Sequence, residues 1–235
     1  NTDFVARANA AGADLVIVAA GFQKSPLALL SLDSNPVTEP DDIAGARIGV
    51  PLGDTATHDA FVDVNGIDVS ATEIVPIGFD AQYVFYTEQP IAVEDAGLVP
   101  ETMLLADYNL NIYAQVYVVT RDTLETKRDA IIGFLTAEIK GWQDFVADPT
   151  LAVELAVNEY GADTGLTIEA QTKQAIRQYD ILITPVTEAN GLLWMGAEDI
   201  ASNVETVHAL GIEMDDSVFD TSLLEEIYEG ASTIE

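Results

Sequence analysis

Short apolar segments that alternate with helical ones constrain the fold of this chain more than any other feature. Leu15–Ala20 is a continuous apolar run that follows the alanine-rich segment Thr2–Ala11, which is typical of a helix leading into a strand buried on both faces. Further strands are predicted at 27–32, 47–51, 73–78, 83–86, 103–107 and 113–120. The alternation predicts an α/β protein with mainly parallel sheets.

One connection conflicts with a simple parallel arrangement. Only Phe79–Gln82 separates the strands predicted at 73–78 and 83–86, whereas a parallel crossover needs about a dozen residues. Either the two strands form an antiparallel hairpin, or a segment is missing between them, and we favour the missing segment. The chain also begins at Asn1, inside a predicted helix and without a start methionine or signal sequence, so we expect that a preceding segment was removed or left out.

The second half of the chain has helical periodicity. Asp122 and Glu125 form a predicted capping pair, and the helix after them extends to Phe145. Its apolar positions are Ile131, Leu135, Ile139 and Trp142. Further helices are predicted at 150–160, 167–179 and 197–210, and we expect them to cover the sheets.

The charge of the chain excludes several classes of partner. With 40 acidic and 9 basic residues the net charge is −31, on a composition that is 49% hydrophobic and therefore folded rather than disordered. Nucleic acids and anionic membranes are excluded, because both need clustered lysine and arginine. Such acidity suits a salt-rich habitat or an exported protein. The longest apolar runs are far shorter than the roughly 20 residues that cross a bilayer.

Catalytic and metal-binding motifs are absent from the sequence. Cysteine does not occur, which removes disulfides, thiolate metal sites and cysteine nucleophiles. The two histidines, His58 and His208, lie in different predicted helices with no zinc-site spacing. No nucleophile elbow, phosphate-binding loop or dinucleotide fingerprint is found. We therefore predict no catalytic residues, no metal and no cofactor.

Loops at strand ends carry the candidate ligand-binding residues. Three loops combine polar or aromatic side chains with the start of a turn or helix: Phe22–Pro26, Val50–Thr57 and Tyr86–Pro90. Proteins with α/β folds bind ligands at such places. Ordinary turn chemistry or helix capping by Asp54 or Thr55 explains the same residues without a ligand. Three further side chains on one strand face are open to either a ligand or a structural role: Tyr113, Gln115 and Tyr117.

These segments also carry a resemblance to a known family. The stretches concerned are Phe22–Leu32, Asp42–Pro51, Gly78–Asp80, Thr87–Pro90 and Ala106–Tyr108. They resemble extracytoplasmic substrate-binding proteins of ABC importers, over Asn1 to about Gly211. The branch that looks most similar binds thiamine-pyrimidine precursors and riboflavin, and is related to the nitrate, sulfonate and taurine binders.

The resemblance implies an α/β fold of the periplasmic-binding-protein type II, with two lobes and a ligand cleft between them. Lobe one would be residues 1–31 plus 113–235, and lobe two would be residues 32–112. Family members have a further strand and helix before the first residue of this chain and a helix near 81–83, so both are expected to be missing. The resemblance further implies a membrane permease as partner, a monomer, and a periplasmic or lipid-anchored extracytoplasmic location.

We expect the ligand to be a neutral aromatic heterocycle, a thiamine-pyrimidine precursor or a riboflavin-like molecule. Lys24 is the one plausible cation near the loops, since Arg47 lies at the far end of its strand, and Glu88 could accept hydrogen bonds from an aminopyrimidine or a flavin imide. The predicted ligand-binding residues are Thr2, Asp3, Phe22, Gln23, Ser25, Asp54, Thr55, Thr57, Tyr86, Glu88, Asp107, Tyr108 and Tyr113.

Two alternatives remain. One is a binder of nitrate, sulfonate or taurine-like anions. The other is an enzyme, a pyrimidine-precursor synthase of the same fold, although such synthases depend on a cysteine-rich motif that this chain lacks.

Overall fold

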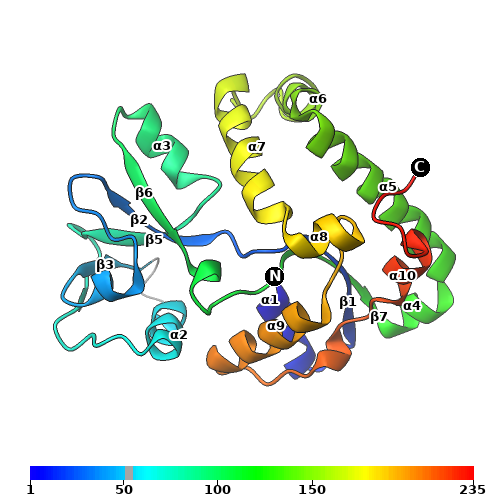
Figure 1. Cartoon of the computed structure of the whole chain (residues 1–235), viewed down its shortest axis with the longest axis horizontal. Helices are drawn as coiled ribbons and strands as arrows, with labels where there is room; N and C mark the ends of the chain where they lie inside the picture. Colours follow the sequence, from blue (N-terminus) through cyan, green and yellow to red (C-terminus); the bar gives the residue numbers. More distant parts are fainter. Residues whose placement is uncertain (51–54) are drawn as a thin grey trace. The chain divides into compact units, whose positions relative to one another are not determined.

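The chain divides into two compact units (Figure 1). The computed structural model describes residues 1–50 and 55–235. The first unit consists of Asn1–Lys24, Ile112–Val207 and Ile212–Glu235, and the second of Ser25–Asn111 and His208–Gly211. The boundary expected after Ser31 therefore differs from the observed one after Lys24. The reason is that the strand containing Ser31 is hydrogen-bonded into the sheet of the second unit.

The first unit is built on a two-stranded antiparallel ribbon. Strand β1 (Leu15–Phe22) pairs with β7 (Ala114–Thr120), so that Leu15 lies opposite Thr120 and Phe22 opposite Ala114. Every residue of β1 after Leu15 is buried, which explains its continuous apolar run. The expectation of mainly parallel sheets is wrong here, because a strand covered on both faces has the same sequence pattern in either direction.

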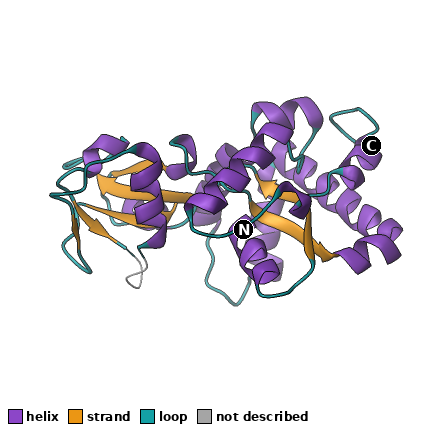
Figure 2. Cartoon of the chain, turned by 90° about the horizontal axis from the view of Figure 1, so that it is seen from below, coloured by secondary structure: helices purple, strands orange, loops and turns teal. Residues whose placement is uncertain are grey.

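Helices surround this ribbon in the first unit (Figure 2). Their bounds are α1 (Thr2–Ala10), α4 (Arg121–Thr126), α5 (Arg128–Ala147), α6 (Pro149–Leu155), the π-helical turn η4 (Ala156–Tyr160), α7 (Ile168–Leu182), α8 (Pro185–Asn190), α9 (Ala197–Ala209), the 3-10 turn η5 (Asp216–Val218) and α10 (Ser222–Tyr228). The predicted capping pair at Asp122 is wrong: Thr120 caps α4 by accepting a hydrogen bond from the Thr123 N–H, and the helix is interrupted at Lys127.

The second unit contains a five-stranded mixed sheet. Its strands are β2 (Leu27–Leu32), β3 (Arg47–Gly49), β4 (Glu73–Ile74), β5 (Ala81–Phe85) and β6 (Pro100–Leu104), in the order β4-β3-β5-β2-β6. Strand β3 is parallel to β4 and β5, whereas β2 is antiparallel to β5 and β6. The helical segments of this unit are η1 (Pro40–Ile43), α2 (Ala56–Asn65), α3 (Gln89–Asp95) and η3 (Leu105–Asp107).

The connection between β4 and β5 is short but is not a hairpin. Both strands are parallel to β3 and lie on its opposite sides, so the antiparallel alternative is wrong. Asp80 anchors the crossing: its N–H donates to the Arg47 carbonyl at 2.8 Å, and its carboxylate accepts from the Arg47 N–H at 2.8 Å. Val75 donates to the Ile48 carbonyl at 3.0 Å. These bonds hold a link of residues 75–80 across β3, and a segment missing at this place stays a prediction.

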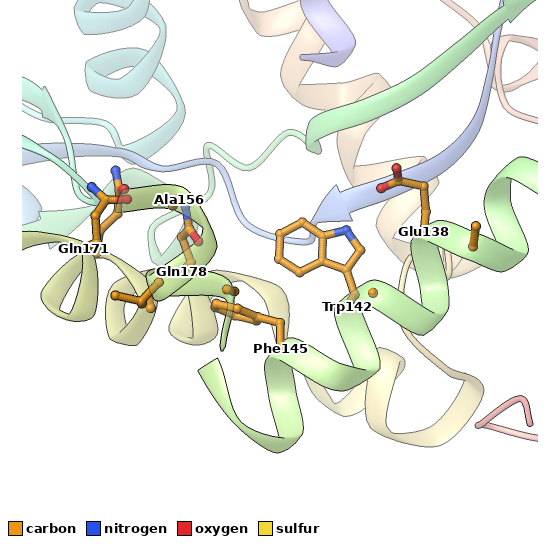
Figure 3. A pocket seen from close by; sticks show the side chains of 12 residues that line it. Glu138, Trp142, Phe145, Ala156, Gln171 and Gln178 are labelled. Carbon is orange, nitrogen blue, oxygen red and sulfur yellow. The ribbon is translucent and has the colours of Figure 1, made fainter. Parts of the chain in front are cut away.

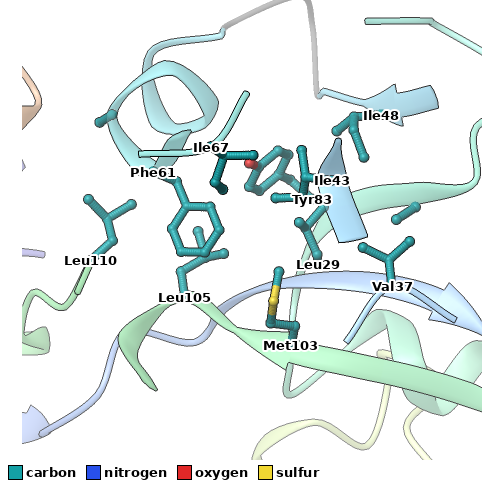
Figure 4. Packing of buried hydrophobic residues seen from close by; sticks show 12 residues of the cluster. Leu29, Val37, Ile43, Ile48, Phe61, Ile67, Tyr83, Met103, Leu105 and Leu110 are labelled. Atoms are coloured by element: carbon teal, nitrogen blue, oxygen red, sulfur yellow. The ribbon is translucent and has the colours of Figure 1, made fainter. Parts of the chain in front are cut away.

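One face of this sheet packs against α2 and η1 to form the core of the second unit (Figure 4). Phe61 on α2, Ile43 on η1 and Leu105 on η3 are fully buried there. The same core contains Leu29, Val37, Ile48, Ala60, Ile67, Ala81, Tyr83, Met103 and Leu110. Helix α2 ends at Asn65 and is capped by Gly66, which adopts the left-handed conformation (φ 64°) that an L-residue with a side chain rarely tolerates. This core fixes the strand ends from which the candidate residues project.

Candidate functional site

The carboxyl ends of β3 and β5 define one edge of the second unit's sheet. The two strands are parallel, and the antiparallel strand β2 begins at the same edge because Leu27 pairs with Phe85. A cavity of about 610 Å³ opens beside these strands and is lined by Leu27, Val50, Phe79, Gln82, Phe85 and Gln89, among others. Ligands of open α/β sheets bind outside the carboxyl ends of the strands, so this edge is a candidate ligand-binding surface.

Two predicted residues meet at this edge. The Tyr86 N–H donates to the Pro26 carbonyl at 2.7 Å, which brings the segment after β5 beside the segment before β2. Ser25 is buried there, with its N–H donating to Asn111 Oδ1 at 3.0 Å and its hydroxyl oxygen accepting from the Leu27 N–H at 3.3 Å. The Ser25 hydroxyl thus already has a structural role in the turn.

Helix starts carry the next group of predicted residues. Thr55 occupies the N-cap position of α2, and its hydroxyl donates to Asp59 Oδ2 at 2.7 Å rather than capping a backbone N–H. Thr57 follows in the first turn and is half-buried, while Asp54 lies outside the described residues. Glu88 occupies the N-cap position of α3 and is exposed, with no side-chain capping bond. An exposed carboxylate at a helix start fits both a ligand contact and a partner for the helix dipole.

Asp107 and Tyr108 lie after β6. Asp107 ends η3 and is exposed. The Tyr108 hydroxyl donates to the Thr38 carbonyl at 3.4 Å, and its own carbonyl accepts from Asn65 Nδ2 at 2.9 Å. These bonds and the packing of Tyr108 against the core give that tyrosine a structural role in the second unit.

In the first unit, Thr2 and Tyr113 form one buried network with Asn203. Asn203 Oδ1 accepts from the Thr2 hydroxyl at 3.0 Å and from the Tyr113 N–H at 2.7 Å, and all three residues are fully buried. The Tyr113 ring packs edge-to-face on Phe219, and burial raises the pKa of its hydroxyl, with the nearby Asp199 carboxylate adding to the shift. The packing therefore supports the structural alternative for Tyr113.

Asp3 lies beside this network in the first turn of α1. Its Oδ1 atom is buried and accepts no hydrogen bond from the described part of the chain. Among the predicted residues of the first unit, Asp3 therefore presents an acceptor for a group outside the described chain.

Phe22 ends strand β1, and Gln23 follows it; both contact the helices. The Phe22 ring is buried and lies edge-to-face on the Trp142 indole, with 6.3 Å between centroids. Gln23 is also buried; its N–H donates to the Ile181 carbonyl at 2.9 Å, and its Nε2 donates to the Ala20 carbonyl at 2.9 Å. Phe22 thus contacts Trp142, which lines a second cavity that was not predicted from the sequence.

This second cavity has a volume of about 410 Å³ and lies between α5, α6 and α7 (Figure 3). Trp142 and Phe145 of α5 line it together with glutamines of α7. The helical periodicity of the sequence predicts only that Trp142 lies on the apolar face of its helix. The signal that could have identified the cavity is the spacing of Gln171, Gln174 and Gln178, which puts three amides on one helix face.

Comparison with known proteins identifies the family. Residues 1–152 match the family described as NMT1/THI5 like. The chain belongs to the NMT1/THI5-like family. Among curated proteins, none matches this NMT1/THI5-like chain.

Solved structures similar to this NMT1/THI5-like protein have the periplasmic-binding-protein fold. The periplasmic aliphatic sulphonate-binding protein of Escherichia coli has a TM-score of 0.68 at 15% identity, over 92% of this chain and 73% of its own. A periplasmic sulfonate-binding protein of Methylobacillus flagellatus KT has a TM-score of 0.61 at 14% identity, over 94% and 71%. A Candida albicans gene product with the generic periplasmic binding protein fold has a TM-score of 0.51 at 16% identity, over 100% and 77%. The predicted fold class is confirmed.

In residues 1–50 and 55–235, no group of three histidine, aspartate or glutamate side chains is arranged to hold a metal ion. Within the same ranges, no helix combines the length and the apolar character needed to cross a membrane.

Proposed function

We propose that this chain is the substrate-binding protein of an ABC importer. It would capture a small aromatic heterocycle outside the cytoplasm and deliver it, as a monomer without catalytic activity, to a membrane permease. Membership of the NMT1/THI5-like family and the periplasmic-binding-protein fold support this proposal. The predicted residues that cluster at strand ends are consistent with it, because α/β sheets bind ligands there.

The choice of a neutral ligand is supported by the cavity of the second unit, whose described lining has no charged side chain, and by the pairing of Arg47, which begins β3 at the end away from that cavity. Arg47 Nη2 and Nε donate to the two carboxylate oxygens of Asp80 at 2.9 and 3.2 Å, and the Arg47 N–H donates to the same group. A guanidinium bound in this bidentate way has its charge compensated and its fork of donors occupied. The cavity of the second unit is meanwhile lined by aromatic and aliphatic side chains with glutamine amides, which suits an uncharged ligand.

A binder of sulfonates or related anions is the second candidate. The observation that favours it is the description of two of the similar solved structures as sulfonate-binding proteins. An anion would have to be held by helix N–H groups together with Lys24, because Arg47 is bound to Asp80.

Calorimetric titration tests the proposal. The protein is titrated with 4-amino-5-hydroxymethyl-2-methylpyrimidine, with riboflavin, and separately with nitrate, taurine and butanesulfonate. We expect saturable binding of one heterocycle, a matching increase in melting temperature, and complete recovery of the unchanged ligand. Tight binding of an anion with none of the heterocycles would overturn the choice of ligand. Consumption of a heterocycle would overturn the assignment as a binding protein.

A further inference from the structure

We propose that the first unit recognises the ring of the ligand in the cavity between α5, α6 and α7. Trp142 and Phe145 form an aromatic wall, and Gln171 and Gln178 belong to a polar wall (Figure 3). Gln174, on the same face of α7, also lines the cavity. This inference rests on the proposed function. The side chains that would select the heterocycle all lie on helices α5 and α7, outside the strand-end loops.

The aromatic wall is held in place before any ligand binds. Trp142 Nε1 donates to the Tyr117 hydroxyl at 3.1 Å, and that hydroxyl donates to Glu138 Oε2 at 2.7 Å. Burial raises the pKa of the Tyr117 hydroxyl, so it remains a donor at neutral pH. The indole is further contacted edge-to-face by Phe22 at 6.3 Å and Phe145 at 5.5 Å. An immobilised indole loses little conformational entropy when a ring packs on it.

The polar wall lies beside the buried apolar residues of α7, which are Ala175, Ile181 and Leu182. Gln171, Gln174 and Gln178 of α7 line the cavity and are half-buried, whereas Ile176 and Tyr179 of the same helix are 60% and 44% exposed. Within the described chain, none of the three amide groups is hydrogen-bonded to another residue. Half-buried amides without a partner in the described chain can hydrogen-bond a molecule that enters the cavity. Each amide offers both a donor and an acceptor, as the edge of an aminopyrimidine or flavin ring does.

Small residues keep the cavity open. The positions between the two walls carry Ala137, Gly141, Ala152, Ala156 and Ala175, none of which extends beyond a Cβ atom. The resulting volume of about 410 Å³ lies within the range of roughly 300–1,000 Å³ that small-molecule sites have. Larger apolar residues at these positions would have closed the space between the helices.

The charge of the lining selects against anions. Among the described residues that line the cavity, Glu138 is the one with an ionisable carboxylate, and no lysine or arginine contributes. A sulfonate or nitrate would therefore meet a carboxylate and no cation, whereas the N–H groups of a neutral heterocycle would meet acceptors. The geometry thus points to a neutral, flat ring with an amide-like or amino-substituted edge.

Fluorescence of Trp142 provides a direct test. The chain has two tryptophans, Trp142 and Trp194, so Trp194→Phe leaves the cavity indole as the sole tryptophan reporter. The probe is the heterocycle that binds in calorimetry, either 4-amino-5-hydroxymethyl-2-methylpyrimidine or riboflavin. Saturable change of Trp142 emission with the calorimetric dissociation constant is the expected result.

Substitution on the facing wall completes the test. Gln174→Leu keeps a similar size of side chain but removes its donor and acceptor, and leucine favours a helix at least as much as glutamine does. We expect at least about tenfold weaker binding of the probe with an unchanged or higher melting temperature. Ile176→Ala, on the exposed side of α7, is the matched control and should leave the dissociation constant unchanged.

The outcomes separate this inference from the proposed function. If the parent protein binds neither heterocycle, the proposed function fails and this inference fails with it. If the parent binds a heterocycle but Trp142 emission is unaffected, or Gln174→Leu and Gln171→Leu both bind it as the parent does, only the location of the ring is overturned.

Discussion

Replacing Asn203 should lower the stability of the first unit strongly, because its side chain bonds two other segments of that unit. It is fully buried on α9, and its side-chain oxygen accepts from both the Thr2 hydroxyl and the Tyr113 N–H. Its Nδ2 donates to the Asp199 carbonyl one turn earlier on the same helix at 2.9 Å. A single amide therefore ties the first turn of α1 and the segment before β7 to α9.

The cost of Asn203→Leu follows from what it leaves behind. The substitution keeps a similar side-chain volume. The Thr2 hydroxyl loses one of its two acceptors, and the Tyr113 N–H loses its acceptor, the Asn203 side-chain oxygen. A buried donor without an acceptor costs about 1–3 kcal/mol. The Thr2 hydroxyl keeps a longer contact of 3.4 Å to the Tyr113 carbonyl, so its share should be at the low end of that range. We expect a loss of about 2–4 kcal/mol in the free energy of unfolding.

Urea denaturation followed by circular dichroism measures this loss. The control is Ser202→Ala, which removes an exposed hydroxyl from the neighbouring position of α9 and should change stability by less than about 0.5 kcal/mol. Combining Asn203→Leu with Thr2→Val removes the donor as well, so the double variant should lose less than the sum of the single variants. A loss below about 1 kcal/mol for Asn203→Leu would refute the view that this amide organises the site-bearing start of α1.

Three further predictions concern stability. Gly191→Ala should lower the free energy of unfolding by at least about 2 kcal/mol, because φ is 105° and an added Cβ atom would collide with the buried Tyr228 ring. Its control is Gly211→Ala, at φ 75° but in open space, which should cost about 1 kcal/mol in the same denaturation assay. Burial lowers the pKa of His58 below 6.5, so the unfolded state binds a proton more readily than the folded state does. The parent should therefore lose stability relative to His58→Gln as the pH falls from about 7.5 to about 5.5. Equal slopes of unfolding free energy against pH for the two proteins would contradict this. The net charge of −31 predicts a higher melting temperature in about 2 M than in about 0.1 M sodium chloride, and a fall would contradict it.

The sequence predicts which segments are buried better than it predicts how they pair. Leu15–Ala20 and Leu27–Leu32 are observed as strands because continuous apolar runs of that length are buried in either kind of sheet. The direction of pairing depends on contacts between distant segments: β1 joins β7 through residues about a hundred positions apart, from Leu15 opposite Thr120 to Phe22 opposite Ala114. Local periodicity has no information on such a pairing. The short helices α8 and α10 were missed because six or seven residues give too few turns to establish a period.

The candidate site shows a similar division. Ser25 and Tyr86 lie at one edge of the second unit's sheet, and the sequence could indicate this position because a strand end is a local property; their role in binding a ligand stays a prediction. Tyr113 was predicted on a strand face open to either role, but it lies before β7 and is buried by contacts with Asn203 and Phe219, which are distant in sequence. The three glutamines of α7 resemble an ordinary solvated face in the sequence. Only the placement of α5 opposite them indicates a cavity.

The high negative charge of the protein bears on the choice between a heterocycle and an anion. With a net charge of −31, the average field of the chain opposes the approach of any anion. At physiological ionic strength this field is screened beyond roughly 8 Å, so selectivity depends on charges within the site itself. The one arginine of the second unit, Arg47, begins β3 at the end away from the site edge and is bound to Asp80. The described lining of the second unit's cavity has no charged side chain, and that of the first unit's cavity contains Glu138 without a cation. Both the long-range and the local charge thus act against a sulfonate, while neither affects a neutral ring. Preference for the ring should therefore persist at high salt, where an advantage based on long-range charge alone would disappear.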